Sequence, residues 1–248
     1  MVNIILSGCN GKMGKMICKC VSERNDCKIS AGIDINPECN GDFPVFTSPA
    51  LCNVDADVII DFSRPANLDL LLCFAVEKKL PTVLATTGFS EEQIKQIHKT
   101  AENIPIFFSA NMSLGVNLLI ELAKLASNAL GKQFDIEIIE KHHNQKVDAP
   151  SGTALMIANA ISEGKNMRYV YDRHSNVQKR SSDEIGISSI RGGTIVGEHE
   201  VIFAGSDEVI TLSHTAYSRS IFANGALNAA LFLADTKPGL YSMKDLLK

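Results

Sequence analysis

The N-terminal half of the chain alternates short apolar runs with amphipathic stretches. Apolar runs bounded by Gly, Pro, Asp or Ser predict buried strands over residues 2–6, 28–33, 56–61, 81–85 and 104–108. Apolar side chains at helical spacing predict helices over residues 14–22, 67–79 and 91–102. Strands and helices that alternate in this way form βαβ units. We therefore expect an α/β domain in which helices cover both faces of a doubly wound parallel sheet.

Beyond residue 112 the pattern changes. Helices are expected over residues 113–130 and from about residue 151. The intervening residues 134–142 alternate like a half-buried strand, with Phe134, Ile136 and Ile138 on one face and Asp135 and Glu137 on the other. Short Gly-containing turns join further apolar runs over residues 185–190, 201–204 and 209–214. These features predict a C-terminal α+β domain with a mixed, largely antiparallel sheet.

Two further segments complete the predicted organisation. Residues 166–183 are polar without a clear period, which is typical of a mobile loop. Residues 221–234 form an apolar helix rich in Ala and Leu, and we expect this helix to pack back on the first domain. The predicted domains are thus residues 1–112 with 219–248, and residues 113–218.

Composition and charge exclude several classes of function. The 248 residues carry 24 Lys and Arg against 28 Asp and Glu, a net charge of −4, so no global basic field attracts nucleic acid or anionic membrane. A content of 45% hydrophobic and 21% charged residues is typical of a soluble globular protein. The start of the chain lacks the pattern of a secretory leader, and no run is long enough for a membrane span. We expect a cytoplasmic protein with no membrane or nucleic-acid partner.

Cysteine usage agrees with a reducing compartment. The seven cysteines are odd in number and show no zinc-type spacing; they are Cys9, Cys18, Cys20, Cys27, Cys39, Cys52 and Cys73. We interpret them as reduced and mostly buried, and we expect no metal site.

A glycine-rich loop follows the first predicted strand and opens the first predicted helix. It reads Gly8-Cys9-Asn10-Gly11-Lys12-Met13-Gly14. Such a loop lets backbone N–H groups approach a pyrophosphate at the positive end of a helix dipole. Asn10 stands where a middle glycine is common, and Asn tolerates a positive φ. Glycine spacing alone fits a turn without a ligand, but Asp34 ends the second strand about 20 residues after Gly14, the separation expected for a carboxylate that binds an adenosine ribose. The motif therefore predicts a Rossmann-like dinucleotide site.

The same loop region bears on the choice of cofactor. Asp34 would repel a 2′-phosphate, and Ile35 and Asn36 supply no arginine to bind one, so NADH is favoured over NADPH. Lys12 could offset this preference. Two more loops follow predicted strands and should face the nicotinamide half; they contain Ala85, Thr86 and Thr87, and Ser109, Ala110, Asn111 and Met112. Residues 61–65 belong to the same edge of the sheet.

The densest polar segment spans residues 137–154 and combines a proton donor with an anion site. Of the adjacent His142 and His143, at most one should act as the proton donor, because neighbours on a strand point to opposite sides. Lys146 offers a cation, and residues 151–153 offer N–H groups and hydroxyls at a helix start that suit a carboxylate. Taken singly, each of these residues also fits an ordinary surface or capping role.

At this segment the chain closely resembles the dihydrodipicolinate reductase (4-hydroxy-tetrahydrodipicolinate reductase) family. Residues 137–154 match every fixed position of E-[IV]-x-E-x-H-x-x-x-K-x-D-x-P-S-G-T-A. The resemblance also covers the glycine loop, Thr86-Thr87-Gly88, Ser109-Ala110-Asn111, residues 192–199 and residues 218–226. It implies NAD(P)H-dependent reduction of 4-hydroxy-tetrahydrodipicolinate to tetrahydrodipicolinate in the diaminopimelate route to lysine. It also implies homotetramers built through the sheet of the second domain.

The resemblance assigns roles residue by residue. It implies that Gly8, Cys9, Asn10, Gly11, Lys12 and Met13 bind the pyrophosphate, that Asp34 binds the ribose, and that Ala85, Thr86, Thr87, Ser109, Ala110, Asn111 and Met112 bind the rest of the dinucleotide. His142 would be the proton donor or acceptor with Lys146 as its proton-donating partner, and His143, Gly152 and Thr153 would bind a carboxylate of the small dicarboxylate substrate.

The chain departs from the family pattern in three places. Ala85 and Asn10 replace glycines, and Asn144-Gln145 replace a more basic pair, which weakens the positive field around a dianion. Two alternatives stay open at this point. One is another NAD(P)-dependent imine or aldehyde dehydrogenase, since a fold alone does not choose the chemistry. The other is a non-catalytic redox sensor that binds NADH, for which the chain offers no partner-binding element.

Overall fold

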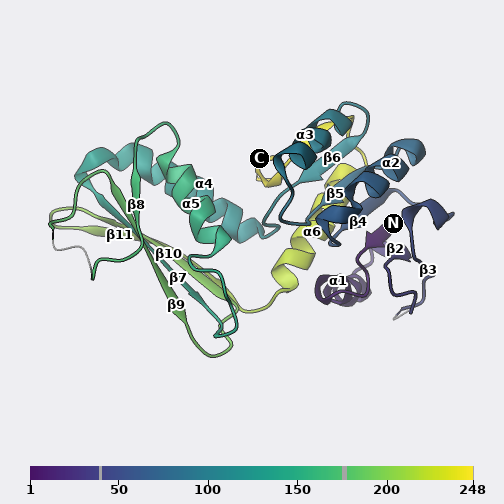
Figure 1. The fold of residues 1–248 in the computed structure, drawn as a ribbon, viewed down its shortest axis with the longest axis horizontal. Coiled ribbons are helices and arrows are strands. Elements are labelled where there is room, and N and C mark those ends of the chain that lie inside the picture. The colour runs from purple at the N-terminus through teal and green to yellow at the C-terminus, as the bar shows by residue number, and fades with distance from the viewer. Residues whose placement is uncertain (39–40, 175–177, 248) are drawn as a thin grey trace. The chain divides into compact units, whose positions relative to one another are not determined.

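The computed structural model describes residues 1–38, 41–174 and 178–247 (Figure 1). The chain divides into two compact units. Unit 1 comprises Met1–Leu114 and Arg219–Lys248, and unit 2 comprises Gly115–Ser218. Each unit has its own sheet and its own apolar core.

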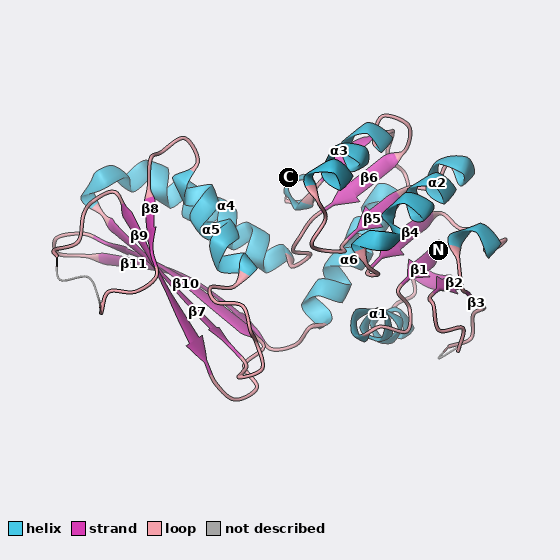
Figure 2. Ribbon diagram, viewed as in Figure 1, coloured by secondary structure: helices cyan, strands magenta, loops and turns pink. Residues whose placement is uncertain are grey.

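Unit 1 is built around a seven-stranded sheet in the order β12-β6-β5-β4-β1-β2-β3 (Figure 2). Its strands are β1 Val2–Ser7, β2 Cys27–Ile33, β3 Val45–Phe46, β4 Val58–Asp61, β5 Thr82–Leu84, β6 Pro105–Phe108 and β12 Gly239–Tyr241. Every pairing among the described residues of this sheet is parallel. The predicted doubly wound α/β fold is confirmed, and only the short strands β3 and β12 lie outside the predicted set.

Helices cover both faces of this sheet and close two apolar layers. The helices are α1 Lys12–Ser22, α2 Leu68–Lys78, α3 Glu91–Thr100 and α6 Ser220–Leu233, with 3-10 turns at Pro49–Leu51, Pro65–Asn67 and Met243–Leu246. Ile4 and Leu6 of β1 pack in the layer of α1 and α6, whereas Ile5 packs in the layer of α2 and α3. These three side chains are fully buried, and burial of each contributes about 1.5–3 kcal/mol. Helix α6 therefore belongs to the core of unit 1, although the whole of unit 2, Gly115–Ser218, precedes it in the chain.

Unit 2 places two helices against one face of a five-stranded sheet in the order β11-β10-β7-β9-β8. The helices are α4 Leu114–Leu130 and α5 Gly152–Ser162, with a 3-10 turn at Gly131–Gln133. The strands are β7 Asp135–His142, β8 Arg168–Val170, β9 Glu184–Arg191, β10 Gly197–Ala204 and β11 Val209–Ala216. The sheet is mixed, as predicted: β10 pairs antiparallel with β7 and β11 along most of its length, whereas β9 pairs parallel with β7 and, over only three residues, with β8.

Two expectations for unit 2 have different outcomes. The alternation predicted for β7 is confirmed, since Ile136 and Ile138 are buried while Asp135 is exposed. The prediction of a loop over residues 166–183 was wrong for Arg168–Val170, which form strand β8. Three residues are too few to show a period, and β8 is defined by its pairing with β9. Residues 175–177 of this segment lie outside the described part.

The cysteines and the helix lengths complete the picture. Of the six cysteines that the structure describes, none forms a disulfide; Cys9, Cys20, Cys27 and Cys52 are buried, Cys18 is half-buried and Cys73 is exposed. Cys39 lies outside the described residues. No helix in the described part of the chain is long and apolar enough to span a membrane.

The packing of α6 against the loop after β6 requires glycine at position 225. A Cβ at this position would lie 1.7 Å from the carbonyl oxygen of Met112, which only a backbone shift can relieve. We expect Gly225→Ala to lower the free energy of unfolding by about 3 kcal/mol. Gly192→Ala is the matched control, because in the described part of the chain no atom beyond its two sequence neighbours lies within 4 Å of the added methyl group. Urea unfolding measures both variants, and equal midpoints for the two would contradict this account of the α6 packing.

Candidate active site

The glycine loop between β1 and α1 adopts a shape that requires glycine. Gly8 has φ +79°, and a Cβ there would lie 2.6 Å from the Phe62 carbonyl oxygen. A Cβ at Gly14 would lie 2.3 Å from the Gly8 carbonyl oxygen. Gly11 is the N-cap of α1 and supplies no capping side chain, so no side chain of the cap covers the first N–H groups of the helix. A ligand could therefore approach the first backbone N–H groups of α1 closely.

Asn10 has a different role from the one that its sequence position suggests. It does not have a positive φ, so tolerance of that conformation is not the reason for Asn here. Its side-chain amide donates to the carbonyl oxygens of Asn36 and Glu38, at 2.7 and 2.8 Å. Its backbone N–H donates to Asp34 Oδ2 at 3.0 Å. Asn10 thus ties the glycine loop to the segment that follows β2.

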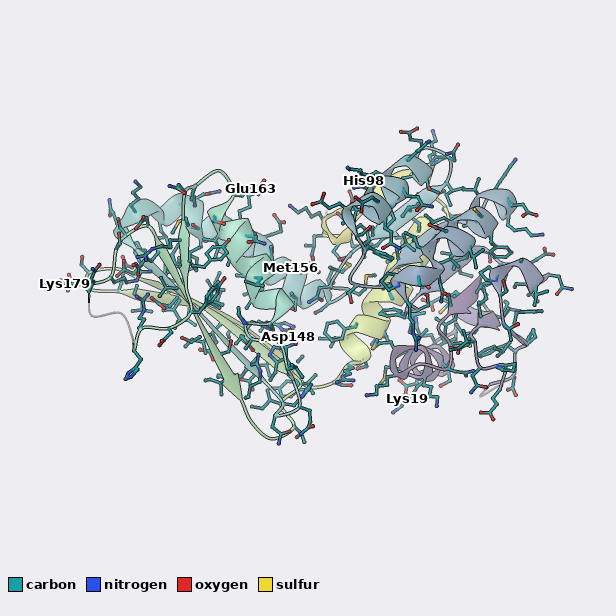
Figure 3. The ribbon with its side chains drawn as sticks, in the orientation of Figure 1. Lys19, His98, Asp148, Met156, Glu163 and Lys179 are labelled. Carbon is teal, nitrogen blue, oxygen red and sulfur yellow. The ribbon has the colours of Figure 1, made fainter. Side chains whose placement is uncertain are left out.

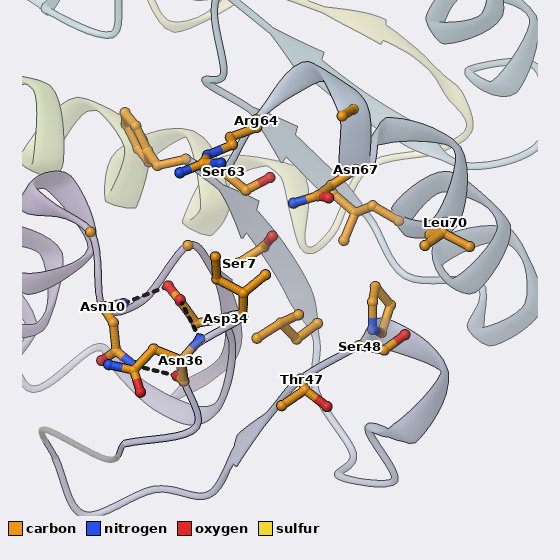
Figure 4. A pocket seen from close by; sticks show the side chains of 18 residues that line it. Ser7, Asn10, Asp34, Asn36, Thr47, Ser48, Ser63, Arg64, Asn67 and Leu70 are labelled. Carbon is orange, nitrogen blue, oxygen red and sulfur yellow. Dashed lines mark hydrogen bonds between the residues drawn. The ribbon is translucent and has the colours of Figure 1, made fainter.

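A cavity of about 550 Å³ opens beside this loop (Figure 4). Four predicted cofactor residues line it: Gly8, Asn10, Gly11 and Asp34. Asp34 also accepts from the Asn36 backbone N–H at 3.1 Å, and its carboxylate faces the cavity with the Arg64 side chain across from it. The Ser63 hydroxyl lines the cavity as well, and it is buried without a hydrogen-bond partner among the described residues. A glycine cradle, a carboxylate and an unpartnered hydroxyl fit the ribose and phosphates of a dinucleotide.

The other predicted cofactor residues do not line this cavity. Ala85, Thr86 and Thr87 follow β5, and Ser109, Ala110, Asn111 and Met112 follow β6, so both sets lie at the carboxyl edge of the sheet. Thr86 is buried and donates to Asp61 Oδ2, at the end of β4, at 2.6 Å. Among the remaining positions, Cys9 is buried, Lys12 is exposed and Met13 is half-buried in the first turn of α1. Sequence reasoning placed Ser63 and Arg64 at this edge, but it missed Thr47, Ser48 and Pro49, because β3 before them was not predicted.

In unit 2 the predicted catalytic residue is held by a buried carboxylate. The buried face of β7 continues from Ile138 to Glu140 and His142, of which Glu140 has no exposed surface. Glu140 Oε2 lies 2.6 Å from His142 Nδ1, and Glu140 Oε1 accepts from the Ser151 backbone N–H at 3.1 Å. Arg191 donates to both oxygens of Glu140, at 2.8 and 2.7 Å. One carboxylate therefore joins the end of β7, the start of α5 and the end of β9.

Burial and these contacts set the charges of the cluster. Burial would raise the pKa of the Glu140 carboxyl, but hydrogen bonds from Arg191, Ser189 and His142 outweigh it and hold the pKa at about 2. Burial lowers the pKa of the His142 imidazole, and Glu140 offsets part of that effect. Burial, reinforced by His142, lowers the pKa of His199 to about 4. Glu140 is therefore ionised and His199 neutral at pH 7.

The predicted substrate residues lie around the segment from β7 to α5. Lys146 Nζ contacts Asp148 Oδ1 at 2.9 Å, and Asp148 is on the loop that leads to α5 (Figure 3). His143 is half-buried, and its Nδ1 has no hydrogen-bond partner among the described residues. Gly152 and Thr153 form the first turn of α5, where Ser151 is the N-cap and its Oγ accepts from the Ala154 N–H at 3.1 Å. In the described residues no group of His, Cys, Asp and Glu side chains is arranged to hold a metal ion.

Comparison with known proteins identifies the family. The model for the N-terminus of dihydrodipicolinate reductase matches residues 2–112, and the model for its C-terminus matches residues 115–247. The chain belongs to the dihydrodipicolinate reductase family. Its members are oxidoreductases that use a nicotinamide cofactor, and the family that the sequence motifs predicted is confirmed.

Individual relatives agree over the whole chain. A 4-hydroxy-tetrahydrodipicolinate reductase of Clostridium tetani is 53% identical over 245 residues, which cover 98% of this chain and 96% of that protein. One from Caldanaerobacter subterraneus is 52% identical and covers 100% and 99%. Among solved structures, a dipicolinate-bound dihydrodipicolinate reductase from Paenisporosarcina is 27% identical with a TM-score of 0.81, over 98% of this chain and 97% of that one.

Sequence reasoning gave no separate role to Glu140, Arg191 or His199. A period-two signal was available for Glu140, because it precedes His142 by two residues and therefore shares its face of the strand. Arg191 and His199 carried no such signal. The register of the sheet pairs Arg191 with His142 and His199 with Glu140. His199 Nε2 lies 3.0 Å from Ser151 Oγ, and the His199 ring meets the His142 ring edge-on.

The lowered pKa of His199 predicts a loss of stability in mild acid. The unfolded chain binds a proton at His199 near pH 6.5, whereas the folded chain resists it down to about pH 4, so stability present above pH 6.5 is lost as the pH falls. Between pH 7 and pH 5 we expect this residue to account for roughly 2 kcal/mol of the loss. Urea unfolding of His199→Gln should therefore show a smaller drop over this interval than the wild type. The exposed His98 provides the control, since His98→Gln should retain the full drop (Figure 3).

Proposed function

We propose that this chain reduces 4-hydroxy-tetrahydrodipicolinate to tetrahydrodipicolinate, in the diaminopimelate route of lysine biosynthesis. The observation that carries the proposal is the buried Glu140–His142 pair next to Lys146 and the N-terminus of α5. This group combines a proton carrier with cationic and N–H donors for a carboxylate, which a reductase of a dicarboxylic imine requires. The identity of the relatives along the full chain supports the same reaction.

The substrate is a small dicarboxylate, held by His143, Gly152 and Thr153. The Paenisporosarcina relative binds dipicolinate, a planar dicarboxylate. In this chain Gly152 and Thr153 form the first turn of α5, and helix N-termini bind carboxylates. The buried Nδ1 of His143, which has no partner among the described residues, suits a second contact. Lys146 adds a positive charge whose present partner, Asp148, is largely exposed and so screened by solvent.

The cofactor is NADH or NADPH, and the cavity of unit 1 would hold its adenosine half. Gly8, Asn10 and Gly11 would bind the pyrophosphate, with Cys9, Lys12 and Met13 in the same loop, and Asp34 the ribose. The loops after β5 and β6 would bind the rest of the dinucleotide, through Ala85, Thr86, Thr87, Ser109, Ala110, Asn111 and Met112. When bound, a reduced nicotinamide supplies the hydride. The protein's part is to bind and orient both ligands and to move the proton, which we assign to His142 with Lys146 as its proton donor.

Asp34 favours NADH over NADPH in this proposal. Its carboxylate accepts hydrogen bonds from a ribose with free hydroxyls and repels a 2′-phosphate. The positive groups that oppose this preference are Lys12 and, from the end of β4, Arg64, which lines the same cavity and supplies the arginine that Ile35 and Asn36 lack. The preference therefore depends on the balance between Asp34 and Arg64.

We also propose a homotetramer that forms through the sheet of unit 2, in the cytoplasm. The face of this sheet opposite α4 and α5 carries Ile139 and Ile202, which are half-buried, and Ile190, which is 46% exposed. Apolar side chains on an open sheet face suit association with a second copy.

The test of the reaction uses the enzyme with each reduced cofactor and freshly generated 4-hydroxy-tetrahydrodipicolinate. We expect loss of reduced-nicotinamide absorbance that depends on the substrate. His142→Gln should lower kcat by about 10²-fold or more with KM within a few-fold of wild type, because it removes a transition-state proton transfer at similar volume. His98→Gln is the control and should leave kcat unchanged.

Two other outcomes would redirect the proposal. Turnover of a different imine or an aldehyde, with none of this substrate, would indicate another dehydrogenase. Binding of NADH without turnover of any of them would indicate a sensor. Full activity of His142→Gln would leave the reaction in place and move the proton to Lys146 or water.

The cofactor preference predicts opposite effects for two substitutions. Asp34→Ala should weaken NADH about 10-fold while weakening NADPH less, because hydrogen bonds to a charged group contribute about 1.5–3 kcal/mol. Arg64→Ala should weaken NADPH more than NADH. Fluorescence titration of both cofactors measures the dissociation constants. Asp34→Asn is a further variant that removes the charge but keeps an oxygen that can accept the hydrogen bond from the glycine loop. Equal effects on the two cofactors would show that neither residue senses the 2′ position.

A further inference from the structure

The Glu140 carboxylate is held by His142 and Arg191, which lie on different strands. It meets His142 Nδ1 at 2.6 Å on its own strand and takes two hydrogen bonds from Arg191 of β9. We propose that Glu140 and Arg191 are positioning residues for His142. Glu140 fixes the imidazole with a proton on Nδ1 and thereby makes Nε2 the nitrogen that carries the proton to the substrate, while Arg191 limits how strongly Glu140 favours the imidazolium. This inference rests on the proposed reductase function.

The tautomer follows from the donors and acceptors around the ring. An ionised carboxylate is an acceptor only, so the atom 2.6 Å from it must carry a proton, and that atom is Nδ1. Glu140 is ionised because Arg191 and the Ser151 N–H surround its two oxygens. In neutral His142 the lone pair therefore lies on Nε2. Gly197 leaves space beside that nitrogen, because a Cβ at this glycine would lie 3.1 Å from Nε2.

The proton transfer passes through a positively charged His142, and the Glu140 carboxylate is already in place to balance that charge. Nε2 accepts a proton from the Lys146 ammonium, which gives an imidazolium, and the new N–H bond breaks when the substrate takes the proton. His142 returns to its neutral form, and Lys146 regains a proton from solvent. Glu140 stabilises the imidazolium while it exists, as a carboxylate does for a histidine that works through its other nitrogen.

Four charged or titratable groups act on His142. Glu140 on β7 favours the imidazolium, whereas Arg191 on β9 and Lys146 on the following loop oppose it. His199 on β10 meets the ring at a centroid distance of 5.2 Å and stays neutral above about pH 4. Removing the charge of Glu140 should therefore make His142 harder to protonate, and removing that of Arg191 should make it easier. A purely structural role would not give opposite signs.

Nitrogen NMR of the full chain tests the tautomer without any assay. The His142 signals are assigned by their loss in His142→Gln. We expect Nδ1 to be protonated in wild-type protein at pH above the imidazole pKa. Protonation on Nε2 instead would overturn the proposal, whether or not the enzyme reduces the proposed substrate. An inactive wild type would refute the proposed function alone.

The same spectra and the kinetics of three variants test the charge balance. In Glu140→Gln we expect the His142 pKa to fall and kcat to drop about 10- to 100-fold, less than general-acid loss itself costs, with KM within a few-fold. In Arg191→Gln the His142 pKa should rise. Arg191→Lys, which keeps the charge, should return it toward the wild-type value, and it also serves if Arg191→Gln does not fold.

A matched control separates position from chemistry. Glu163, the C-cap residue of α5, is paired with Lys124 of α4, so Glu163→Gln makes the same chemical change away from His142 and from the open face of the sheet. This control should leave both kcat and the His142 pKa at their wild-type values. Shifts of the His142 pKa in the same direction for Glu140→Gln and Arg191→Gln, or no shift in either, would overturn the proposed balance.

Discussion

The arrangement of unit 2 depends on one buried carboxylate. Glu140 has no exposed surface, and an isolated carboxylate in such a place would cost several kcal/mol. It is retained because donors from three elements reach it: Arg191 at the end of β9, the Ser151 N–H at the start of α5, and His142 two residues further along β7. Each donor is thereby fixed in place by the same charge. The need to satisfy Glu140 thereby places the proposed proton carrier and the helix end proposed to bind a carboxylate together.

Unit 1 uses a carboxylate in a related way with less burial. Asp34 accepts from the backbone N–H groups of Asn10 and Asn36, so it holds the glycine loop against the segment after β2. A carboxylate has about four acceptor sites, so these two bonds leave capacity for ribose hydroxyls. Asp34 therefore serves the shape of the loop and the proposed ligand at once. This double role explains why its removal and its neutralisation are different experiments.

The sequence predicted those parts of the fold and the site that local patterns determine. Residues 104–108 form a continuous apolar run, and residues 113–130 are enough to show a helical period. The glycine loop and the segment around His142 are each contiguous in the sequence, so their motifs can be recognised there. The short strands β3, β8 and β12 show no period and are defined only by their partners. The parallel pairing of β7 with β9 also cannot be predicted from the local sequence of either strand. Arg191 follows Glu140 by 51 residues, and only this pairing brings the two together.

The net charge of −4 gives no indication of where a dianion could bind. Two cations of unit 2, Arg191 and Lys146, differ in how deeply their carboxylate partners are buried. Arg191 faces a carboxylate with no exposed surface, so its charge is neutralised within the protein. Lys146 faces Asp148, whose side chain is 61% exposed, and water can replace that contact at little cost. Of these two cations, Lys146 is the one that can turn to a ligand. With Asn144 and Gln145 uncharged, the proposed attraction for a second carboxylate depends largely on the N-terminus of α5, because the helix dipole there is independent of the overall charge.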